Sequence, residues 1–299
     1  MNQLELIREL QGSANLVFCS HDAGGAELLS SFILGNNLSG KFLVSGPATK
    51  VFHSKNLLSS QNTISVLPNE TSILLSSTGS TDFEYSYMSI AIQLGVRVVA
   101  VLDHWVNYRE RFIREGENIL PDIILVPDDL ALKIAKDEFP KIEIILIHND
   151  FLESFEKEYR ELGTMPIEYD YVFMCESGSA HSSTKQAVDN NNLSGLEHFF
   201  SVLSLMGHNE SRILLRPHPS DPEKNYTKFV PRTFPFVTIS SARSLPEVLK
   251  ISNIIVGCNS MALIVAETVG KMVYSVVKDS QHRYLSIGNI ALPSEMNKK

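Results

Sequence analysis

Short apolar runs alternate with helical patterns along the whole chain. Runs such as 15–20 (NLVFCS) and 72–76 (SILLS) are bounded by polar turns, which is typical of buried strands. Further apolar runs predict strands over 41–45, 97–102, 121–127 and 141–148, with helical patterns over 26–34, 84–94 and 128–139. Thr81 and Glu84 have the spacing of a helix-capping box. Strands that alternate with helices are typical of a parallel α/β architecture.

The second half of the chain repeats this pattern after an interruption. Residues 150–168 are charged and contain Gly163 and Pro166, which is typical of a boundary between domains. Apolar runs then predict strands over 171–175, 212–219, 253–257 and 271–277, with helices over 195–206 and 260–270. Ser244 and Glu247 form a second capping-box pattern. The expected fold class is α/β, with two Rossmann-like parallel domains, residues 1–165 and 166–299, that face a cleft.

Composition narrows the class of protein. Hydrophobic residues make up 43% and charged residues 20%, as in ordinary soluble globular proteins. The 26 basic and 34 acidic residues give a net charge of −8, which argues against a nucleic-acid partner. Cys19, Cys175 and Cys258 are far apart in apolar runs, so buried thiols in a reducing compartment are expected. The charged N-terminus is unlike a signal peptide, and the apolar runs are too short to span a bilayer, so a cytoplasmic protein is expected.

Ligands of open α/β sheets bind outside the carboxyl ends of the strands, so the residues that follow each strand are the candidates for chemistry. The first candidate is the turn 20–25 (SHDAGG). Gly24 and Gly25 allow the backbone to approach an acceptor, and His21 or Asp22 can act as a general base for a hydroxyl. The alternative is a plain glycine turn in which Asp22 caps the following helix.

Two further turns follow predicted strands of the first domain. Ser77 and Thr78 lie in a hydroxyl-rich turn that can bind a sugar hydroxyl or a phosphate, or that simply caps a helix. The segment 103–112 (DHWVNYRERF) places acidic, imidazole and guanidinium groups beside aromatic rings. That combination favours a carbohydrate-facing loop, with a salt-bridged structural loop as the alternative. The residues singled out there are Asp103 as a candidate base, and His104, Trp105 and Arg109 as acceptor-binding residues.

The fourth candidate is the turn 216–219 (RPHP) in the second half. Its two prolines restrict the backbone, and both Arg216 and His218 can donate to phosphate oxygens. Turns rich in Ser and Gly favour phosphates at helix N-termini, and an acidic side chain suits a ribose diol. The residues of this kind are Ser177, Gly178, Ser179, Asn259, Ser260 and Glu267.

The second half resembles the donor-binding domain of GT-B glycosyltransferases. The resemblance rests on RPHP at 216–219 and on GCNSMALIVAETVGKMVYSV at 257–276, and it covers roughly the last 130 residues. The RPHP turn resembles turns of bacterial surface-polysaccharide transferases, and a similar His-Pro element occurs in GT-B sialyltransferases and Kdo transferases. The resemblance implies that His218 binds the donor phosphate, that Ser177, Ser179, Asn259 and Ser260 bind phosphate or ribose, and that Glu267 holds the ribose. The chain departs from the family in being short and in lacking a clear long C-terminal helix.

No Asp-x-Asp sequence occurs, so neither a metal nor another cofactor is expected, and Arg216, His218 and helix N-termini would stabilise the leaving group. The resulting hypothesis is a metal-independent inverting glycosyltransferase of bacterial surface-glycan assembly. Its partners would be a nucleotide-sugar donor, with a CMP-activated acidic sugar slightly favoured over a UDP-sugar, and a glycan or lipid-linked acceptor. A lipid-linked acceptor would allow peripheral association with a membrane. Asp22 or Asp103 would deprotonate the acceptor, with His21 as a third candidate.

Two other readings of the sequence remain open. The first is a nucleotide-sugar hydrolase or 2-epimerase with the same fold and donor pocket. The second is a non-catalytic protein that binds a sugar or a nucleotide. Consumption of a nucleotide-sugar without an acceptor distinguishes the first from the transferase.

Overall fold

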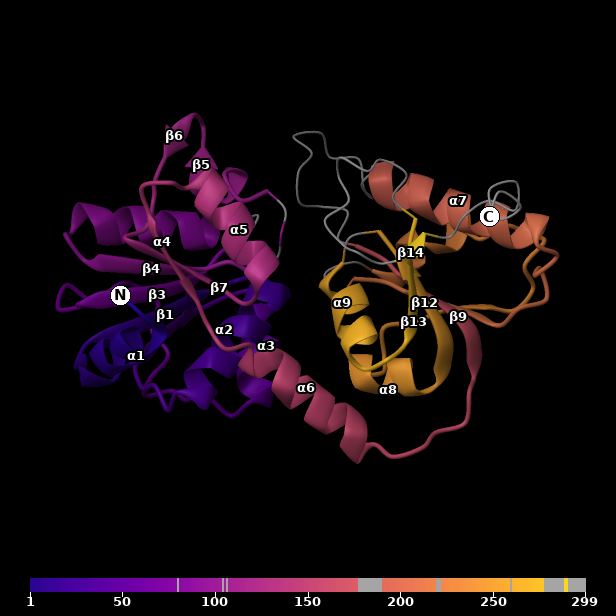
Figure 1. The fold of residues 1–299 in the computed structure, drawn as a ribbon, viewed down its shortest axis with the longest axis horizontal. Coiled ribbons are helices and arrows are strands. Elements are labelled where there is room, and N and C mark those ends of the chain that lie inside the picture. Colours follow the sequence, from indigo (N-terminus) through magenta and orange to yellow (C-terminus); the bar gives the residue numbers. More distant parts are fainter. Residues whose placement is uncertain are drawn as a thin grey trace. The chain divides into compact units, whose positions relative to one another are not determined.

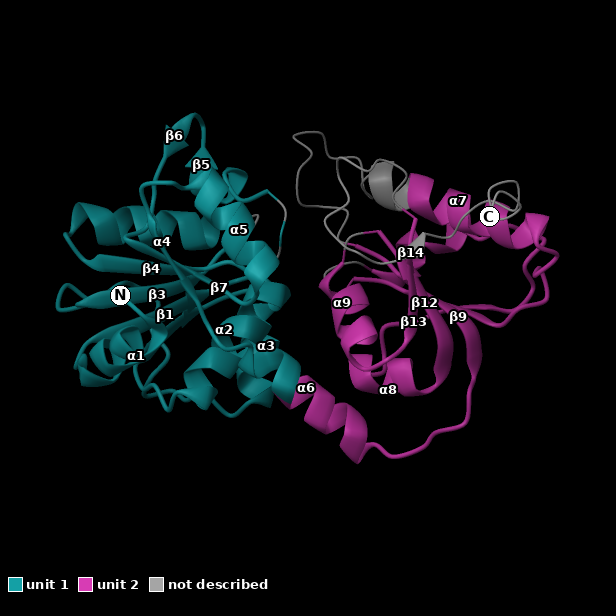
Figure 2. Ribbon diagram, in the orientation of Figure 1, with its two compact units in different colours: residues 1–153 teal, residues 154–299 magenta. Residues whose placement is uncertain are grey.

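The structure is a computed structural model. It describes residues 1–79, 81–103, 105, 107–176, 190–218, 222–258, 260–276 and 288–289. The chain divides into two compact units, Met1–Glu153 and Ser154–Lys299 (Figure 2). The division lies within helix α6 (Asp150–Glu161), which occupies most of the charged segment between the two predicted domains.

Unit 1 is built on a parallel sheet of six strands (Figure 1). In spatial order these are β2 (Lys41–Val44), β1 (Leu16–Ser20), β3 (Ile73–Ser77), β4 (Arg97–Val101), β7 (Ile123–Val126) and β8 (Glu143–Leu146). The helices are α1 (Gln3–Gly12), α2 (Ala23–Gly35), α3 (Ala48–Ser54), α4 (Asp82–Gln93) and α5 (Asp129–Glu138). Between β4 and β7 lie the 3-10 helix η1 (Glu110–Phe112) and an antiparallel hairpin of β5 (Ile113–Arg114) and β6 (Glu117–Asn118).

The central strands of unit 1 are covered on both faces, which explains why their sequences are continuously apolar. Every residue of β1 is buried. Leu16 and Phe18 belong to one core cluster with residues of α1, α2 and α3, whereas Val17 and Cys19 alternate with them and are equally buried. Such burial on both faces is characteristic of parallel sheets.

Unit 2 repeats the architecture with its own sheet and core. In spatial order the strands are β11 (Val237–Ile239), β10 (Ile213–Arg216), β9 (Tyr169–Met174), β12 (Ser252–Gly257), β13 (Met272–Ser275) and β14 (Gly288–Asn289), all parallel. The helices are α7 (Asn190–Leu205), α8 (Leu245–Lys250), α9 (Met261–Thr268) and the 3-10 helices η2 (Glu223–Asn225) and η3 (Thr227–Phe229). Phe173 of β9 packs on Phe199 of α7 with ring centroids 5.3 Å apart.

Most of the local sequence predictions agree with this fold. The capping box of Ser244 and Glu247 is confirmed, and all three cysteines are buried. The capping box of Thr81 and Glu84 is wrong, because neither side chain makes the hydrogen bond of a cap and the Glu84 carboxylate has other donors. No helix in the described part of the chain has both the length and the apolarity that crossing a membrane requires.

Candidate active site

Three of the four predicted sites lie at one edge of the unit 1 sheet. Strands β1, β3 and β4 are neighbours in that order, and all run parallel. The turns at their carboxyl ends therefore meet. They carry His21 and Asp22 after β1, Thr78 and Gly79 after β3, and Asp103 after β4. This edge is where open α/β sheets bind ligands.

His21 and Asp22 form a side-chain pair at this edge. The Nδ1 atom of His21 lies 2.9 Å from Oδ1 of Asp22, and the two side chains are 24% and 32% exposed. Asp22 occupies the position of the N-cap of α2, but its carboxylate makes no capping hydrogen bond. The plain capping role that the sequence offered for Asp22 is therefore not what its side chain does. The pairing holds the imidazole by one nitrogen, as in a base that is oriented by a carboxylate.

The carboxylate of Glu84, on the first turn of α4, lies beneath this pair and is 1% exposed. Its Oε1 atom accepts hydrogen bonds from the backbone N–H of His21 at 2.8 Å and of Asp22 at 3.4 Å. The hydroxyl of Ser77 lies 3.2 Å from the same oxygen, and that of Thr81 lies 3.4 Å from Oε2. Burial, and to a lesser degree the nearby charge of Asp22, raises the pKa of Glu84. The sequence assigned Glu84 only to a cap, so this role was missed.

Glycines allow the turns to approach one another closely. A Cβ atom at Gly24 would lie 2.6 Å from Oδ2 of Asp103, and one at Gly25 would lie 2.8 Å from Cβ of Ser77. The two glycines that the sequence selected are thus required for the contact between the start of α2 and the ends of β3 and β4.

Asp103 is held by Arg111, a residue that the sequence reading did not select. Nη1 of Arg111 donates to Oδ1 of Asp103 at 2.6 Å, and the two side chains are 13% and 15% exposed. The same nitrogen lies 3.1 Å from the Thr78 carbonyl oxygen and 2.9 Å from its hydroxyl, which in turn donates to the Val101 carbonyl. The ion pair thus links the ends of β3 and β4 and fixes the position of the Asp103 carboxylate.

Trp105 and Arg109 contact α5. The indole N–H of the buried Trp105 lies 3.1 Å from both carboxylate oxygens of Asp128, which also caps α5. The side chain of Arg109 is 60% exposed and pairs with Glu138 at the other end of that helix. These contacts connect both side chains to α5. His104 lies outside the described residues.

The predicted donor residues in unit 2 lie partly within the described chain. Arg216 ends β10, and its Nη1 donates to the Arg243 carbonyl at 2.6 Å. Burial lowers the pKa of the Arg216 guanidinium, and the charge of Glu247 opposes that shift. Ser260 caps α9 by accepting a hydrogen bond from the N–H of Ala262, whereas Glu267 is exposed in the last turn of that helix. His218 is half-buried. The predicted residues that lie outside the described part are Ser177, Gly178, Ser179 and Asn259.

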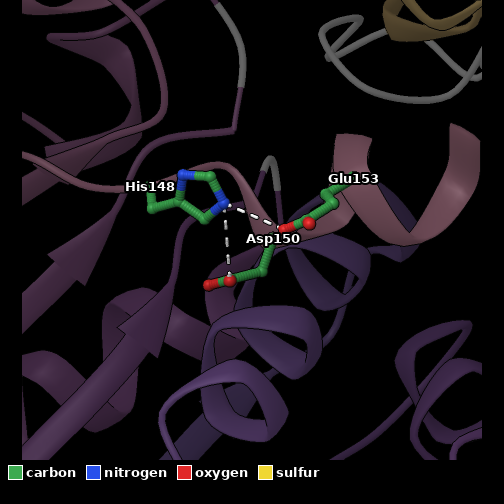
Figure 3. A group of neighbouring side chains, drawn as sticks. All are labelled: His148, Asp150 and Glu153. Carbon is green, nitrogen blue, oxygen red and sulfur yellow. Dashed lines mark hydrogen bonds and ion pairs between the residues drawn. The ribbon is translucent and has the colours of Figure 1, made fainter.

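A group of titratable side chains also lies at the start of α6 (Figure 3). Nε2 of His148 lies 3.1 Å from a carboxylate oxygen of Glu153 and 4.0 Å from one of Asp150. One donor atom from each residue lies within 4.8 Å of the other two, as in some metal sites. The pairing of an imidazole with acidic groups at a helix N-terminus also accounts for this arrangement.

No protein-family model matches the chain, and no curated protein matches its sequence. Among solved structures, the UDP-GlcNAc 2-epimerase of Methanocaldococcus jannaschii aligns with a TM-score of 0.52 at 14% identity, over 87% of this chain and 83% of that one.

Two more structures align over most of their length. A putative UDP-N-acetylglucosamine 2-epimerase from Listeria monocytogenes has a TM-score of 0.57 at 11% identity, over 95% of this chain and 87% of that one. Arabidopsis thaliana UGT89C1 complexed with UDP has a TM-score of 0.52 at 9% identity, over 90% of this chain and 82% of that one. At such identities the likeness concerns the fold. The chain has the GT-B-type fold of two Rossmann-like parallel α/β domains.

Proposed function

We propose that the protein is a metal-independent inverting glycosyltransferase that uses a nucleotide-sugar donor. The observation that carries this proposal is the His21–Asp22 pair at the carboxyl edge of a GT-B-type domain. The structure of UGT89C1, which shares the fold, holds UDP. In the proposed reaction an acceptor hydroxyl attacks the anomeric carbon, the bond from that carbon to the phosphate oxygen breaks, and the nucleotide leaves.

Unit 1 would bind the acceptor and remove its proton. Asp22 accepts a hydrogen bond from Nδ1–H of His21, so Nε2 of the imidazole is the atom that takes the proton from the hydroxyl. Gly46, with a φ of +55°, leaves room at this nitrogen, because a Cβ at that position would collide with the ring. The Asp103 carboxylate, fixed by Arg111, would orient a second hydroxyl of the acceptor. Of the three candidate bases, His21 fits this role best, with Asp22 positioning it.

Unit 2 would bind the nucleotide and stabilise its departure. Arg216 and His218 flank Pro217 at the carboxyl end of β10, and Ser260 is the N-cap of α9 after β12. Charged donors and a helix N-terminus are the groups that stabilise a leaving phosphate when no metal ion does so. A CMP-activated acidic sugar suits such a site slightly better than a UDP-sugar, because a monophosphate leaving group carries less charge than a diphosphate.

Calorimetry tests the donor part of the proposal. CMP, CDP, UDP, GDP and ADP are titrated in the presence of EDTA into the wild type, His218→Ala and, as a control, His53→Ala on the exposed face of α3. We expect one nucleotide to bind selectively, with binding weakened in His218→Ala and unchanged in His53→Ala. If no nucleotide binds with EDTA or with Mg²⁺, the transferase proposal fails.

A 2-epimerase or hydrolase is the second candidate, because two of the structures with the same fold are a UDP-GlcNAc 2-epimerase and a putative one. The test uses nucleotide-sugars that carry the nucleotide found by calorimetry. Each is incubated with the protein in D₂O without an acceptor, and the products are identified by NMR. Release of free sugar and nucleotide indicates a hydrolase, and a new nucleotide-sugar with exchanged C2 hydrogen indicates an epimerase. A donor that is consumed only with an acceptor supports the transferase. A nucleotide that binds but is never consumed indicates a binding protein.

A further inference from the structure

Glu84 is the most deeply buried acidic side chain among the described residues of unit 1, and its partners are unusual. Glu84 is 1% exposed. Its carboxylate accepts hydrogen bonds from the backbone N–H groups of His21 and Asp22, which lie 63 and 62 positions earlier in the chain. A carboxylate without hydrogen bonds would be very costly at such burial. The hydrogen bonds from the turn after β1 and from the hydroxyls of Ser77 and Thr81 therefore account for its presence there.

Two other glutamates with the same local sequence pattern behave differently. Glu5 and Glu247 each accept a hydrogen bond from the backbone of their own N-cap residue, which completes a capping box. Glu84 stands at the same position of α4 but makes no such bond. Its carboxylate instead connects α4 to the turn that carries the His21–Asp22 pair. Local helix capping does not explain this residue.

The space for this arrangement depends on Gly79. A Cβ atom at Gly79 would lie 2.6 Å from Oδ2 of Asp22 and 3.1 Å from Oε1 of Glu84. Both carboxylates therefore border the space that the missing side chain leaves. The Oδ1 atom of Asp22 contacts the imidazole while Oδ2 faces Gly79, so the position of Asp22 depends on Glu84 and Gly79.

The structure assigns to Glu84 the role of a positioning residue for the His21–Asp22 pair. By holding the backbone N–H groups of both residues, it fixes the imidazole in the orientation in which Nδ1 faces Asp22 and Nε2 faces Gly46. This inference rests on the proposed function for its kinetic consequence, but the orientation of His21 is a property of the protein alone. A displacement of about 1 Å at a reacting group costs about 100-fold in rate.

The test compares Glu84→Gln with Glu5→Gln, a matched capping-box glutamate on α1 of the same unit. Glutamine keeps the size of Glu84 but removes its charge and one acceptor oxygen. Imidazole ¹⁵N NMR of the full chain, assigned through His21→Gln, reports the tautomer of His21 directly. We expect a single tautomer with Nδ1 protonated in the wild type and in Glu5→Gln, and a mixture of tautomers in Glu84→Gln. We also expect kcat to fall about 10- to 100-fold with KM changed less than about two-fold.

The inference is overturned if Glu84→Gln keeps the wild-type His21 spectrum and differs from the wild type only in thermal stability, as Glu5→Gln would. If Glu84→Gln does not fold, Glu84→Asp decides, because it keeps the charge but withdraws the carboxylate from the backbone N–H groups of His21 and Asp22. An altered His21 spectrum then supports the inference, and an unaltered one overturns it. If the wild type turns over no nucleotide-sugar, the proposed function fails while the spectrum of His21 still decides the role of Glu84.

Discussion

The carboxyl edges of the two sheets differ in how their charged groups are satisfied. In unit 1 the polar side chains pair with one another: His21 with Asp22 and Asp103 with Arg111. In unit 2 the guanidinium of Arg216 donates to a backbone carbonyl, and among the described residues no ion pair involves it. One edge therefore holds groups in fixed mutual orientation, whereas the other keeps a cation that a ligand can neutralise.

This difference matches the two halves of the proposed reaction. Proton transfer needs a base whose ring orientation is fixed before the substrate arrives, and paired side chains provide this. Binding of a phosphate needs positive charge that is not already neutralised by the protein. If the comparison is right, changes at the edge of unit 1 act mainly on turnover and stability. Changes at the edge of unit 2 act mainly on nucleotide binding.

The largest effect is expected from His21→Ala. Removal of a general base costs between about 100- and 10,000-fold in rate, so kcat should fall about 1,000-fold. The dissociation constant of the nucleotide should stay within about two-fold, because the substitution lies in the other unit. Steady-state kinetics and calorimetry measure the two quantities, with His53→Ala as the control. Turnover within a few-fold of the wild type would assign the base to Asp22 or Asp103.

The next effect concerns the Asp103–Arg111 ion pair. Removal of one partner of a fully buried pair costs about 3–5 kcal/mol, and the slight exposure of this pair reduces that to about 2–3 kcal/mol. Asp103→Asn should lower the free energy of unfolding of unit 1 by this amount, as measured by urea denaturation. In the double variant with Arg111→Met, much of the loss should be recovered.

The control for this ion pair is Glu70→Gln, which breaks the exposed pair with Lys41 on the same unit. It should change stability by less than about 1 kcal/mol. Equal losses in Asp103→Asn and Glu70→Gln would show that the Asp103–Arg111 pair does not fix the edge.

The fold could be predicted because its signals are local. Apolar runs of strand length alternate with helical patterns, and a parallel sheet that is covered on both faces makes those runs continuous, as in β1. The turns at the carboxyl ends were found for the same reason. The hairpin of β5 and β6 was not predicted, since its four strand residues are half-buried or exposed and leave no apolar pattern.

The contacts within the site could be predicted only in part. Thr81 and Glu84 have the spacing of a capping box, but the buried N–H groups of the distant His21 turn compete for the carboxylate. Trp105 stays a predicted acceptor-binding residue, but the sequence did not reveal that its indole N–H contacts Asp128. In both cases the deciding partner is far away in the sequence, where neither spacing nor periodicity can reveal it.

A smaller effect is expected from Arg216→Met. Loss of one charge-assisted hydrogen bond to a phosphate weakens binding by about 1.5–3 kcal/mol, which is at least about ten-fold in the dissociation constant. Calorimetry at two salt concentrations measures it, with the exposed Arg232→Met as the control. At saturating donor, kcat should change little. Wild-type affinity in Arg216→Met would contradict the assignment of the nucleotide to this edge.

The smallest effect is expected at the amino ends of the unit 2 strands. It shows whether an ion pair there contributes to stability alone and not to nucleotide binding. Asp170, near the amino end of β9, pairs with Arg212 at 2.9 Å, and that hydrogen bond lowers the pKa of the carboxyl. A carboxyl with a lowered pKa in the folded state stabilises the fold above its unfolded pKa, about 3.9, and this contribution is lost as the pH falls through the folded value.

Asp170→Asn should therefore be less stable than the wild type at pH 7 by up to about 1 kcal/mol, because the side chains of Arg212 and Asp170 are 51% and 35% exposed and water screens the pair. The difference should shrink as the pH falls below about 4. Chemical denaturation across this range measures it, with Glu161→Gln in the exposed Lys157–Glu161 pair as a control. Nucleotide binding should be unchanged, because the pair lies at the amino ends of the strands whose carboxyl ends carry Arg216. Weaker nucleotide binding in Asp170→Asn would mean that the charges of unit 2 act together, and the distinction between its two edges would fail.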